Sequence, residues 1–571
     1  MSDRPLPVTL FWHMHQPPYR DALSGRYVLP WTYLHAIKDY TDMAWHLEAQ
    51  PGAKAVVNFT PVLIGQIEDL DRSVRAHLQE GVPLPDALLA TLGHAPLPVD
   101  TEGRLGILRA CLRADRENLI GRFASLARLA DLATAVNTPD LVQYVSDQML
   151  YDLSVWYHIA WMGESVRRED PRIAALVAKE RSFDAADRLS LLQLIGELLA
   201  SVLPRFRKLS DSGRCELAVS PYSHPILPLL LDFASAKDGE PAAPGPRHAS
   251  YPGGAERVAW HLQQAVQFHE RVFGRAPRGC WPSEGAISEP AIRAIEAAGF
   301  DWLATSVAVL RPSLALSGIA VPSDNNAAER LLNRAFRIPG SNLDCFFRHD
   351  AISDLIGFTY SGWHGDDAVA NFVHELERTE EITRDQPGRT LLVALDGENA
   401  WEYYPFNGFY FLSALYKALA EHPRLKLMTL SEVVDDMDAQ GVQPAPLPRV
   451  RAGSWVYGTM STWMGAADKN AGWDLLCDAK QAFDAAVAGG HLTDSELYRA
   501  REQLAACEAS DWFWWFGDYN PAAAVRDFDE LFRHQLASLY RSLHLEPPVT
   551  LQRSISAGHG APESGGVMRR S

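Results

Sequence analysis

The chain has 571 residues, of which 47% are hydrophobic and 22% are charged, as in an average globular protein, so neither a disordered chain nor a membrane span is indicated. Its 53 basic and 71 acidic side chains give a formal net charge of -18, which disfavours nucleic acid, an anionic membrane or another polyanion as partner. The length exceeds one ordinary core and predicts a large barrel with a second domain.

The N-terminus and the cysteines bear on the cellular compartment. The chain begins without a basic segment followed by a long apolar run, and the apolar stretch 8–12 is too short for a signal peptide. The six cysteines are scattered and never form a Cys-x-x-Cys pair, so we expect free thiols. These features predict a cytoplasmic protein.

Short apolar runs bounded by turn residues recur along the chain. Such runs are typical of strands that are buried on both faces of a parallel sheet. Helical patterns such as 256–273 and 289–298 separate several of them, and this alternation predicts an α/β fold. The runs are residues 8–12, 55–59, 216–220, 279–281, 302–305, 343–347 and 391–395. This number of strands predicts a distorted parallel barrel.

The rest of the chain has mostly helical patterns. We expect a catalytic barrel over residues 1–408 with a helical insertion at about 65–209. A mostly helical C-terminal domain is expected over 409–545, with one more strand-like run at its start, and Thr493 with Glu496 has the spacing of a capping box. The remaining residues 546–571 lack periodicity, and we expect a disordered tail.

Polar clusters follow four of the predicted strands, at the end where parallel barrels carry their active sites. His13 and His15 follow the first strand, His224 the third, Glu284 the fourth and Asp396 the last. Keeping two carboxylates at the ends of buried strands is costly unless something offsets the lost hydration. Paired carboxylates are what cleavage of a glycosidic bond needs, so Glu284 and Asp396 are the predicted catalytic pair.

Other interpretations of these residues stay open. A glutamate at a helix start can simply favour the helix dipole, and Asp-Gly is a common turn. The His13-x-His15 pattern also begins zinc sites of hydrolases, with His224 as a further ligand. Because the residues after His15 supply no third ligand, we favour no metal and no cofactor, with the histidines as hydrogen-bond partners of sugar hydroxyls.

Five motifs occur in a fixed order along the chain. They are His-Met-His-Gln-Pro at 13–17, Gly-Arg-Cys-Glu at 213–216 leading into Ser-Pro-Tyr-Ser-His-Pro at 220–225, Trp-Pro-Ser-Glu at 281–284, Leu-Asp-Gly-Glu-Asn at 395–399 and Gly-Ser-Trp at 453–455. In this order they resemble the successive conserved regions of glycoside hydrolase family 57, most closely its amylopullulanase and alpha-amylase-like members. The resemblance extends from residue 8 to about residue 540.

This resemblance implies an incomplete (β/α)7 barrel, a helical C-terminal domain and retention of configuration at α-glucosidic bonds. It implies Glu284 as nucleophile and Asp396 as general acid/base, whereas Glu398 is expected behind the site or at the surface. A retaining mechanism needs the two carboxyl groups about 5 to 5.5 Å apart. Burial and the charge of Glu284 should then raise the pKa of Asp396.

The expected substrate contacts surround this pair. Glu216 is expected either near the substrate or as a buried charge paired with an arginine. The sequence does not decide whether four further elements border the cleft or pack in the core: Trp363, His364, Asp366 and the segment 511–518. The predicted binding residues are His13, His15, Glu216, His224, Trp281 and Trp455, with the two tryptophans as stacking faces.

These expectations lead to a retaining hydrolase that acts on starch, glycogen or maltodextrin. An alpha-glucan transferase on the same scaffold is the nearest alternative, because both reactions share the covalent intermediate. A metal-dependent polysaccharide hydrolase or deacetylase and a non-catalytic glucan-binding protein are more distant ones. The expected partner is an alpha-glucan, with no nucleic acid and no membrane, and the sequence leaves the oligomeric state open.

Overall fold

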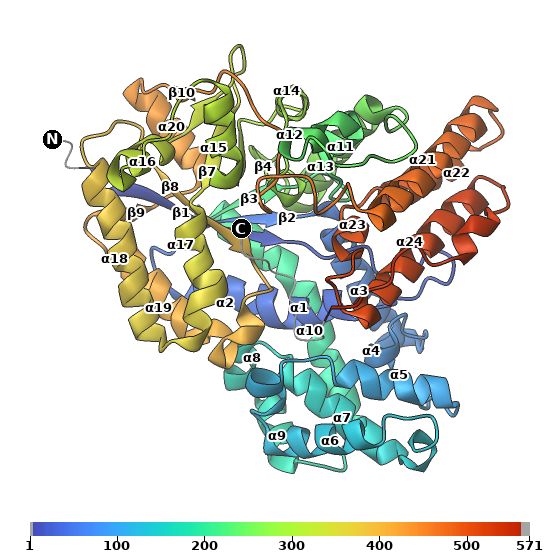
Figure 1. The fold of residues 1–571 in the computed structure, drawn as a ribbon. Coiled ribbons are helices and arrows are strands. Elements are labelled where there is room, and N and C mark those ends of the chain that lie inside the picture. The colour runs from blue at the N-terminus through green and yellow to red at the C-terminus, as the bar shows by residue number, and fades with distance from the viewer. Residues whose placement is uncertain (1–3, 561–571) are drawn as a thin grey trace.

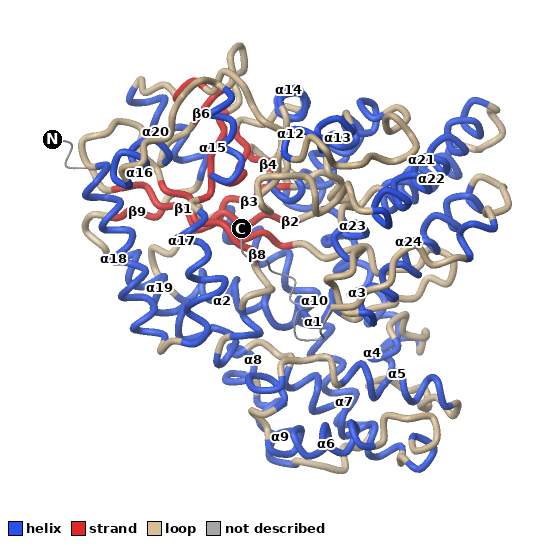
Figure 2. The backbone as a smooth tube through the Cα atoms, in the orientation of Figure 1, coloured by secondary structure: helices blue, strands red, loops and turns tan. Residues whose placement is uncertain are grey.

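The computed structural model describes residues 4–560, and a parallel barrel lies at its centre, surrounded by helices (Figures 1 and 2). Seven strands pair in the order β1, β2, β3, β4, β5, β7, β8, and β8 pairs again with β1, all in parallel. The strands are β1 (Leu6–Met14), β2 (Ala55–Phe59), β3 (Cys215–Val219), β4 (Gly279–Cys280), β5 (Trp302–Ser306), β7 (Asp344–Arg348) and β8 (Leu391–Asp396). These are the seven predicted runs, so the incomplete (β/α)7 barrel is confirmed.

Large side chains fill the interior of the barrel. Phe11, Trp281 and Trp302 form a buried cluster there, with the ring centroids of Phe11 and Trp281 5.0 Å apart. Alternate residues of a strand point to one face, so the cluster takes every second residue of β5 and β8, such as Trp302 and Ala304. A packed interior leaves the ends of the strands as the place for a site.

The sheet continues beyond residue 408, where the C-terminal domain was expected to begin. Strand β9 (Leu425–Leu427) pairs with the start of β1, and β10 (Ala445–Pro446) pairs with β6 (Phe336–Arg337). Helix α19 (Phe409–Ala420) precedes β9 in the chain, and α20 (Leu430–Gln440) lies between β9 and β10. These short strands extend the barrel sheet, so the part of the chain that forms the barrel reaches residue 446.

The expected insertion between β2 and β3 is helical and extends to one side of the barrel (Figure 1). Its last helix, α10, is long and apolar enough to cross a membrane by length and composition, but half of its most apolar window is buried inside the protein. The helices are α3 (Pro61–Glu80), α4 (Ala87–Ala90), α5 (Thr101–Cys111), α6 (Ala124–Ala135), α7 (Asp147–Ala160), α8 (Glu164–Glu169), α9 (Pro171–Lys179) and α10 (Ala185–Asp211).

The C-terminal helices follow the sheet-forming part of the chain. Thr493 and Glu496 form the predicted capping box, each side chain bonding the other's backbone N–H. The helices are α21 (Ala467–Ala488), α22 (Asp494–Cys507), α23 (Asp511–Trp515) and α24 (Ala522–Ser542). The chain between β3 and β8 adds α13 (Gly254–Phe273), α14 (Glu289–Ala297) and α18 (Gly365–Thr383), among others.

Part of the predicted tail is ordered against these helices. Residues Val549–Gln552 form a helical turn, and the Ser556 hydroxyl donates to Asp468 at 2.7 Å. The Gly560 N–H donates to the carbonyl of Asn520 at 3.0 Å. Residues 561–571 lie outside the described part, but 546–560 depart from the prediction because their backbone has partners. The six cysteines are free and buried, as predicted.

Candidate active site

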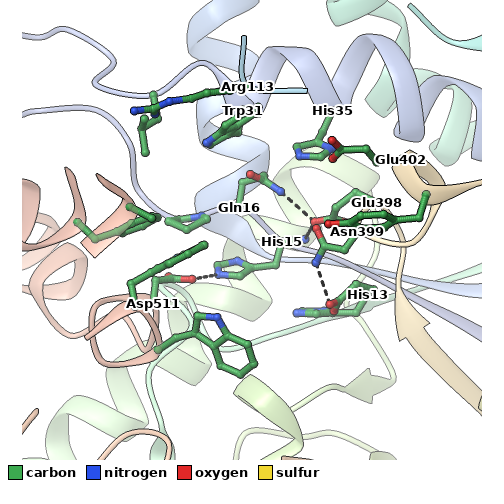
Figure 3. A pocket seen from close by; sticks show the side chains of 18 of the residues that line it. His13, His15, Gln16, Trp31, His35, Arg113, Glu398, Asn399, Glu402 and Asp511 are labelled. Atoms are coloured by element: carbon green, nitrogen blue, oxygen red, sulfur yellow. Dashed lines mark hydrogen bonds and ion pairs between the residues drawn. The ribbon is translucent and has the colours of Figure 1, made fainter. Parts of the chain in front are cut away.

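A cavity of about 770 Å³ opens at the carboxyl ends of the barrel strands. Glu284 and Asp396, predicted from motifs more than 100 residues apart, both line it. So do His13, His15 and Trp455, and further walls come from the insertion and the C-terminal helices. Figure 3 shows His13 and His15 in this cavity with Glu398, Asn399 and Asp511 around them. The structure therefore brings the proposed carboxylate pair together with three of the six expected binding residues.

Glu284 lies in a strained turn directly after β4. Its φ of 57° is in the left-handed region, which residues other than glycine rarely occupy, and such strain often accompanies functional sites. The Trp455 indole N–H donates to its carboxylate at 3.0 Å, and the Trp455 backbone N–H donates to its carbonyl at the same distance. These contacts hold the carboxylate at the wall of the cavity.

Asp396 ends strand β8 and lies partly buried in the cavity wall. Burial raises the pKa of its carboxyl to about 6, although the hydrogen bond from the Asn399 amide at 2.9 Å and the charges of His15 and Arg348 act against this. A Cβ at the next residue, Gly397, would lie 2.1 Å from the sulfur of Met14, so only glycine fits there. With a pKa of about 6, Asp396 carries its proton below about pH 6, which a general acid needs.

Glu398 ties the loop after β8 to the loop after β1. Its Oε1 accepts from the His15 backbone N–H and from the Gln16 amide, both at 3.1 Å. It is only 2% exposed and borders the cavity, so the expected surface position is wrong. Burial and the nearby charge of Asp396 raise its pKa well above the usual value, which favours the neutral form.

The three predicted histidines form a stack. The ring centroids of His15 and His224 are 3.9 Å apart, and those of His13 and His224 are 5.1 Å apart. Burial and the neighbouring His15 lower the pKa of His13 to about 3, so its ring is neutral. Its Nδ1 is 2.6 Å from the amide oxygen of Asn58 and carries the proton, so Nε2 acts as an acceptor.

His15 has protein partners on both ring nitrogens, whereas His224 has one on Nδ1 and its Nε2 makes no hydrogen bond to the described residues. His15 Nε2 bonds Asp511 at 2.8 Å and Nδ1 bonds Thr60 at 3.0 Å. His224 is fully buried, with Nδ1 3.0 Å from the hydroxyl of Ser510, and is absent from the cavity wall. His224 therefore supports His15 from behind.

His15, His224 and Asp511 are the group whose composition fits a metal site, with donor atoms within 4.8 Å of one another. An imidazole binds a metal along its ring plane, and the two rings are stacked at 25°. Two stacked rings cannot both direct their in-plane lone pairs at one ion without turning. The close hydrogen bond between His15 and Asp511 already uses one donor atom from each. This geometry favours a hydrogen-bonded pair over a coordination site.

Trp281 and Glu216 lie outside the cavity wall. Trp281 is fully buried between His13 and Trp455, with ring centroids 5.8 and 5.0 Å away, so it backs the site and offers no open face. Glu216 is the second residue of β3, at the opposite end of the barrel. It accepts from the Trp302 indole and the Ser431 backbone N–H, each at 3.0 Å. The structure thus separates Glu216 from the substrate, and its partners differ from the expected arginine.

The sequence left some lining residues undecided and missed others. Asp511 lines the cavity, whereas Trp363 is 44% exposed and lies outside its wall, as do His364 and Asp366. Arg348 was missed, although it ends strand β7. It lines the cavity, donates to the carbonyl of Ala394 at 2.7 Å and pairs with nearby aspartates. A search for polar residues after every predicted strand would have found it.

A parallel barrel that brings two carboxylates and a neutral histidine into one cavity has the groups that cleavage of a glycosidic bond requires. The model described as glycosyl hydrolase family 57 matches residues 9–446. The chain belongs to this family and is a glycoside hydrolase-family enzyme. The comparison with curated proteins gave no significant match.

Solved structures share the fold over nearly the whole chain. A GH57 branching enzyme from the archaeon Thermococcus kodakaraensis is 16% identical with a TM-score of 0.60, covering 96% of this chain and 94% of its own. The GH57-type branching enzyme from Pyrococcus horikoshii is also 16% identical, with a TM-score of 0.58 and the same coverage. An alpha-amylase from Thermotoga maritima is 13% identical, with a TM-score of 0.55, and covers 95% and 94%. At these identities the likeness shows the fold alone.

Proposed function

We propose that the protein cleaves α-glucosidic bonds of starch, glycogen or maltodextrin through a covalent glycosyl-enzyme intermediate. Glu284 is the nucleophile and Asp396 the general acid/base. The observation that carries this proposal is the different environment of two carboxylates in one cavity. Desolvation raises the pKa of Asp396 to about 6, whereas Glu284 accepts a hydrogen bond from Trp455, which suits an ionised oxygen.

In the first step a Glu284 oxygen attacks the anomeric carbon while Asp396 donates its proton to the glycosidic oxygen. The bond from the anomeric carbon to that oxygen breaks, and the leaving chain departs as an alcohol. In the second step the Asp396 carboxylate takes a proton from water, whose oxygen attacks the anomeric carbon and releases Glu284. Two inversions give net retention.

The surrounding residues suit a neutral sugar in this position. His13 Nε2 accepts a hydrogen bond from a hydroxyl, and the partly buried ring of Trp455 offers an apolar face to a sugar. The names of the structural relatives, branching enzymes and an alpha-amylase, support an alpha-glucan as substrate. The net charge of -18 agrees with a neutral polymer. We also propose a cytoplasmic location, supported by the six free cysteines.

A second candidate is transfer of the glycosyl group to another glucan. The two reactions differ only in the acceptor, which is water in hydrolysis and a sugar hydroxyl in transfer. The walls that the insertion and the C-terminal helices add to the cavity favour this candidate, since they enclose the site and provide surface for a second sugar chain.

The test is incubation with amylose, pullulan and maltooligosaccharides, followed by chromatography and NMR of the anomeric products. Released reducing sugar of retained configuration supports hydrolysis, and altered chain lengths with little reducing sugar support transfer.

Glu284→Ala and Asp396→Asn should each lower kcat by several orders of magnitude. Azide should restore turnover of the Glu284 variant, and Asp366→Asn, outside the cavity, is the matched control. Inverted products, or near-normal rates of either catalytic variant, would contradict the proposal. Loss of activity on chelation, restored by zinc, would favour a metal mechanism.

A further inference from the structure

The cavity extends beyond the catalytic carboxylates into an arm beneath the helical insertion. The arm is the part of the cavity lined by His35, Arg113, Asp115, Trp161 and Glu402. In Figure 3 His35 and Glu402 lie on the side of Glu398 and Asn399 that faces away from His13. We propose that His35 and Glu402 bind the sugar on the leaving side of the scissile bond and the acceptor sugar that replaces it. This inference rests on the function proposed above.

His35 is held rigidly, with one ring nitrogen left over. Its Nδ1 is 2.7 Å from Asp39, whose other oxygen accepts from the Lys38 ammonium at 2.6 Å. The side chains of Lys38 and Asp39 are 0% exposed, and burying an ion pair is costly in free energy. Both belong to a π-helical turn, Ala36–Tyr40, a distortion frequent at functional sites. The buried Lys38–Asp39 pair fixes the orientation of His35 through its bond to Asp39.

The remaining nitrogen of His35 is available to a ligand. Burial lowers the pKa of His35, against the opposing effect of Asp39, so the ring is neutral. With the proton on Nδ1 facing Asp39, Nε2 is an acceptor, and among residues 4–560 it makes no hydrogen bond. The residue is 8% exposed, and that exposure is to the cavity. A buried, unpartnered acceptor in a cavity wall calls for a donor from a ligand.

Glu402 supplies the complementary group. It lies in the helical turn Trp401–Tyr403, and its Oε1 accepts from the Asp115 backbone N–H at 2.8 Å. Burial raises the pKa of Glu402, partly offset by the charge of Lys38, and this favours the protonated form, which can donate as well as accept. One acceptor and one donor match neighbouring hydroxyls of a sugar ring.

The position of the arm identifies which sugar it holds. The leaving oxygen must contact Asp396, so the sugar attached to that oxygen lies on the Asp396 side of the cavity. Glu402 follows Asp396 in the same loop after β8, whereas Glu284 and Trp455 belong to other segments. The two cations of this region, Lys38 and Arg113, already pair with Asp39 and Asp527, so the arm offers no free cation for an anionic ligand. The arm therefore suits a neutral glucan chain.

The experiment compares two donors that differ in the leaving group. Maltohexaose leaves a sugar in the arm, whereas α-maltotriosyl fluoride leaves only fluoride ion. His35→Gln and Glu402→Gln should each lower kcat/KM for maltohexaose about tenfold, the effect of one lost hydrogen bond in a buried site. Fluoride release should stay within about twofold of the wild type. Transfer to added maltose should fall with maltohexaose cleavage, and Glu197→Gln, an exposed carboxylate of the insertion, is the control.

The outcomes distinguish failure of the arm assignment from failure of the proposed function. Equal losses on both donors, or no loss on either, would overturn the assignment of the arm. A wild-type enzyme that leaves maltotriosyl fluoride intact would overturn the proposed function and the assignment with it. Thermal melting checks the fold of each variant. If the His35 variant unfolds, the nearly isosteric Glu402→Gln decides alone, because its side chain makes one backbone contact.

Discussion

Trp455 and Glu284 are bound to each other twice, once through the side chains and once through the backbone. The indole N–H donates to the carboxylate and the backbone N–H donates to the carbonyl, each at 3.0 Å. A segment that follows the last strands of the sheet thus fixes a residue in the loop after β4. The nearby bridge between Ile287 and Gly453 reinforces this contact. The proposed nucleophile is therefore oriented both by the loop after β4 and by the segment that contains Trp455.

Trp455→Phe keeps an aromatic face but removes the N–H that bonds Glu284. A hydrogen bond to a charged group contributes about 1.5–3 kcal/mol, so kcat should fall roughly 10- to 100-fold. Steady-state kinetics on maltooligosaccharides measure this, with the exposed Trp363→Phe as control. Unchanged kcat in the Trp455 variant would show that the bond does not orient the nucleophile.

The pH profile should report the raised pKa of Asp396. As a general acid it must carry its proton, so kcat/KM should decline above about pH 6, tenfold for each further pH unit. The bond from Asn399 lowers this pKa, so Asn399→Ala should move the alkaline limb to higher pH. A limb that stays in place in this variant would mean that another group controls it.

Glu216→Gln separates a structural role from a catalytic one. Gln keeps the shape but changes the hydrogen bonding to Trp302 and Ser431 at the far end of the barrel. We expect a loss of about 1–3 kcal/mol in the free energy of unfolding and an unchanged kcat. Urea denaturation and kinetics together check this. A selective fall in kcat with intact stability would place Glu216 in catalysis after all.

The buried Glu508 predicts how acid affects stability. Burial disfavours its charge, yet the charge of Arg257 and the bond from His261 outweigh this and lower its pKa to about 2. A lowered pKa means that this stabilisation is complete above about pH 4.5 and is lost as the pH falls toward 2. Tryptophan fluorescence during urea unfolding, measured across this range, checks the window.

Arg257→Met removes the cation that balances Glu508. At neutral pH this leaves a buried charge without its partner and should cost about 3–5 kcal/mol of unfolding free energy. Arg247, whose side chain is 73% exposed in its pair with Asp474, is the control, since Arg247→Met should cost less than about 1 kcal/mol. Equal effects of the two variants would contradict this account.

The barrel was predictable because parallel strands buried on both faces read as short apolar runs, from residues 8–12 to 391–395. Their carboxyl ends meet at one side of the barrel, so His13, Glu284 and Asp396 could be assigned to one site before any distance was known. Glu216 was misplaced because a strand has two ends, and a charge at its start lies across the barrel from the site.

The sequence by itself determined the strands, the order of the motifs and the carboxylate pair, since these depend on local hydrophobicity and on residue type. Only the tertiary structure decided which side chains face the cavity. It placed His224 and Trp281 behind the wall, brought Asp511 to His15, and set His35 and Glu402 in the arm. These contacts join residues that are distant in the chain. Their geometry depends on how the strand-end loops, the helical insertion and the C-terminal helices pack around the barrel, and no local sequence pattern encodes that packing.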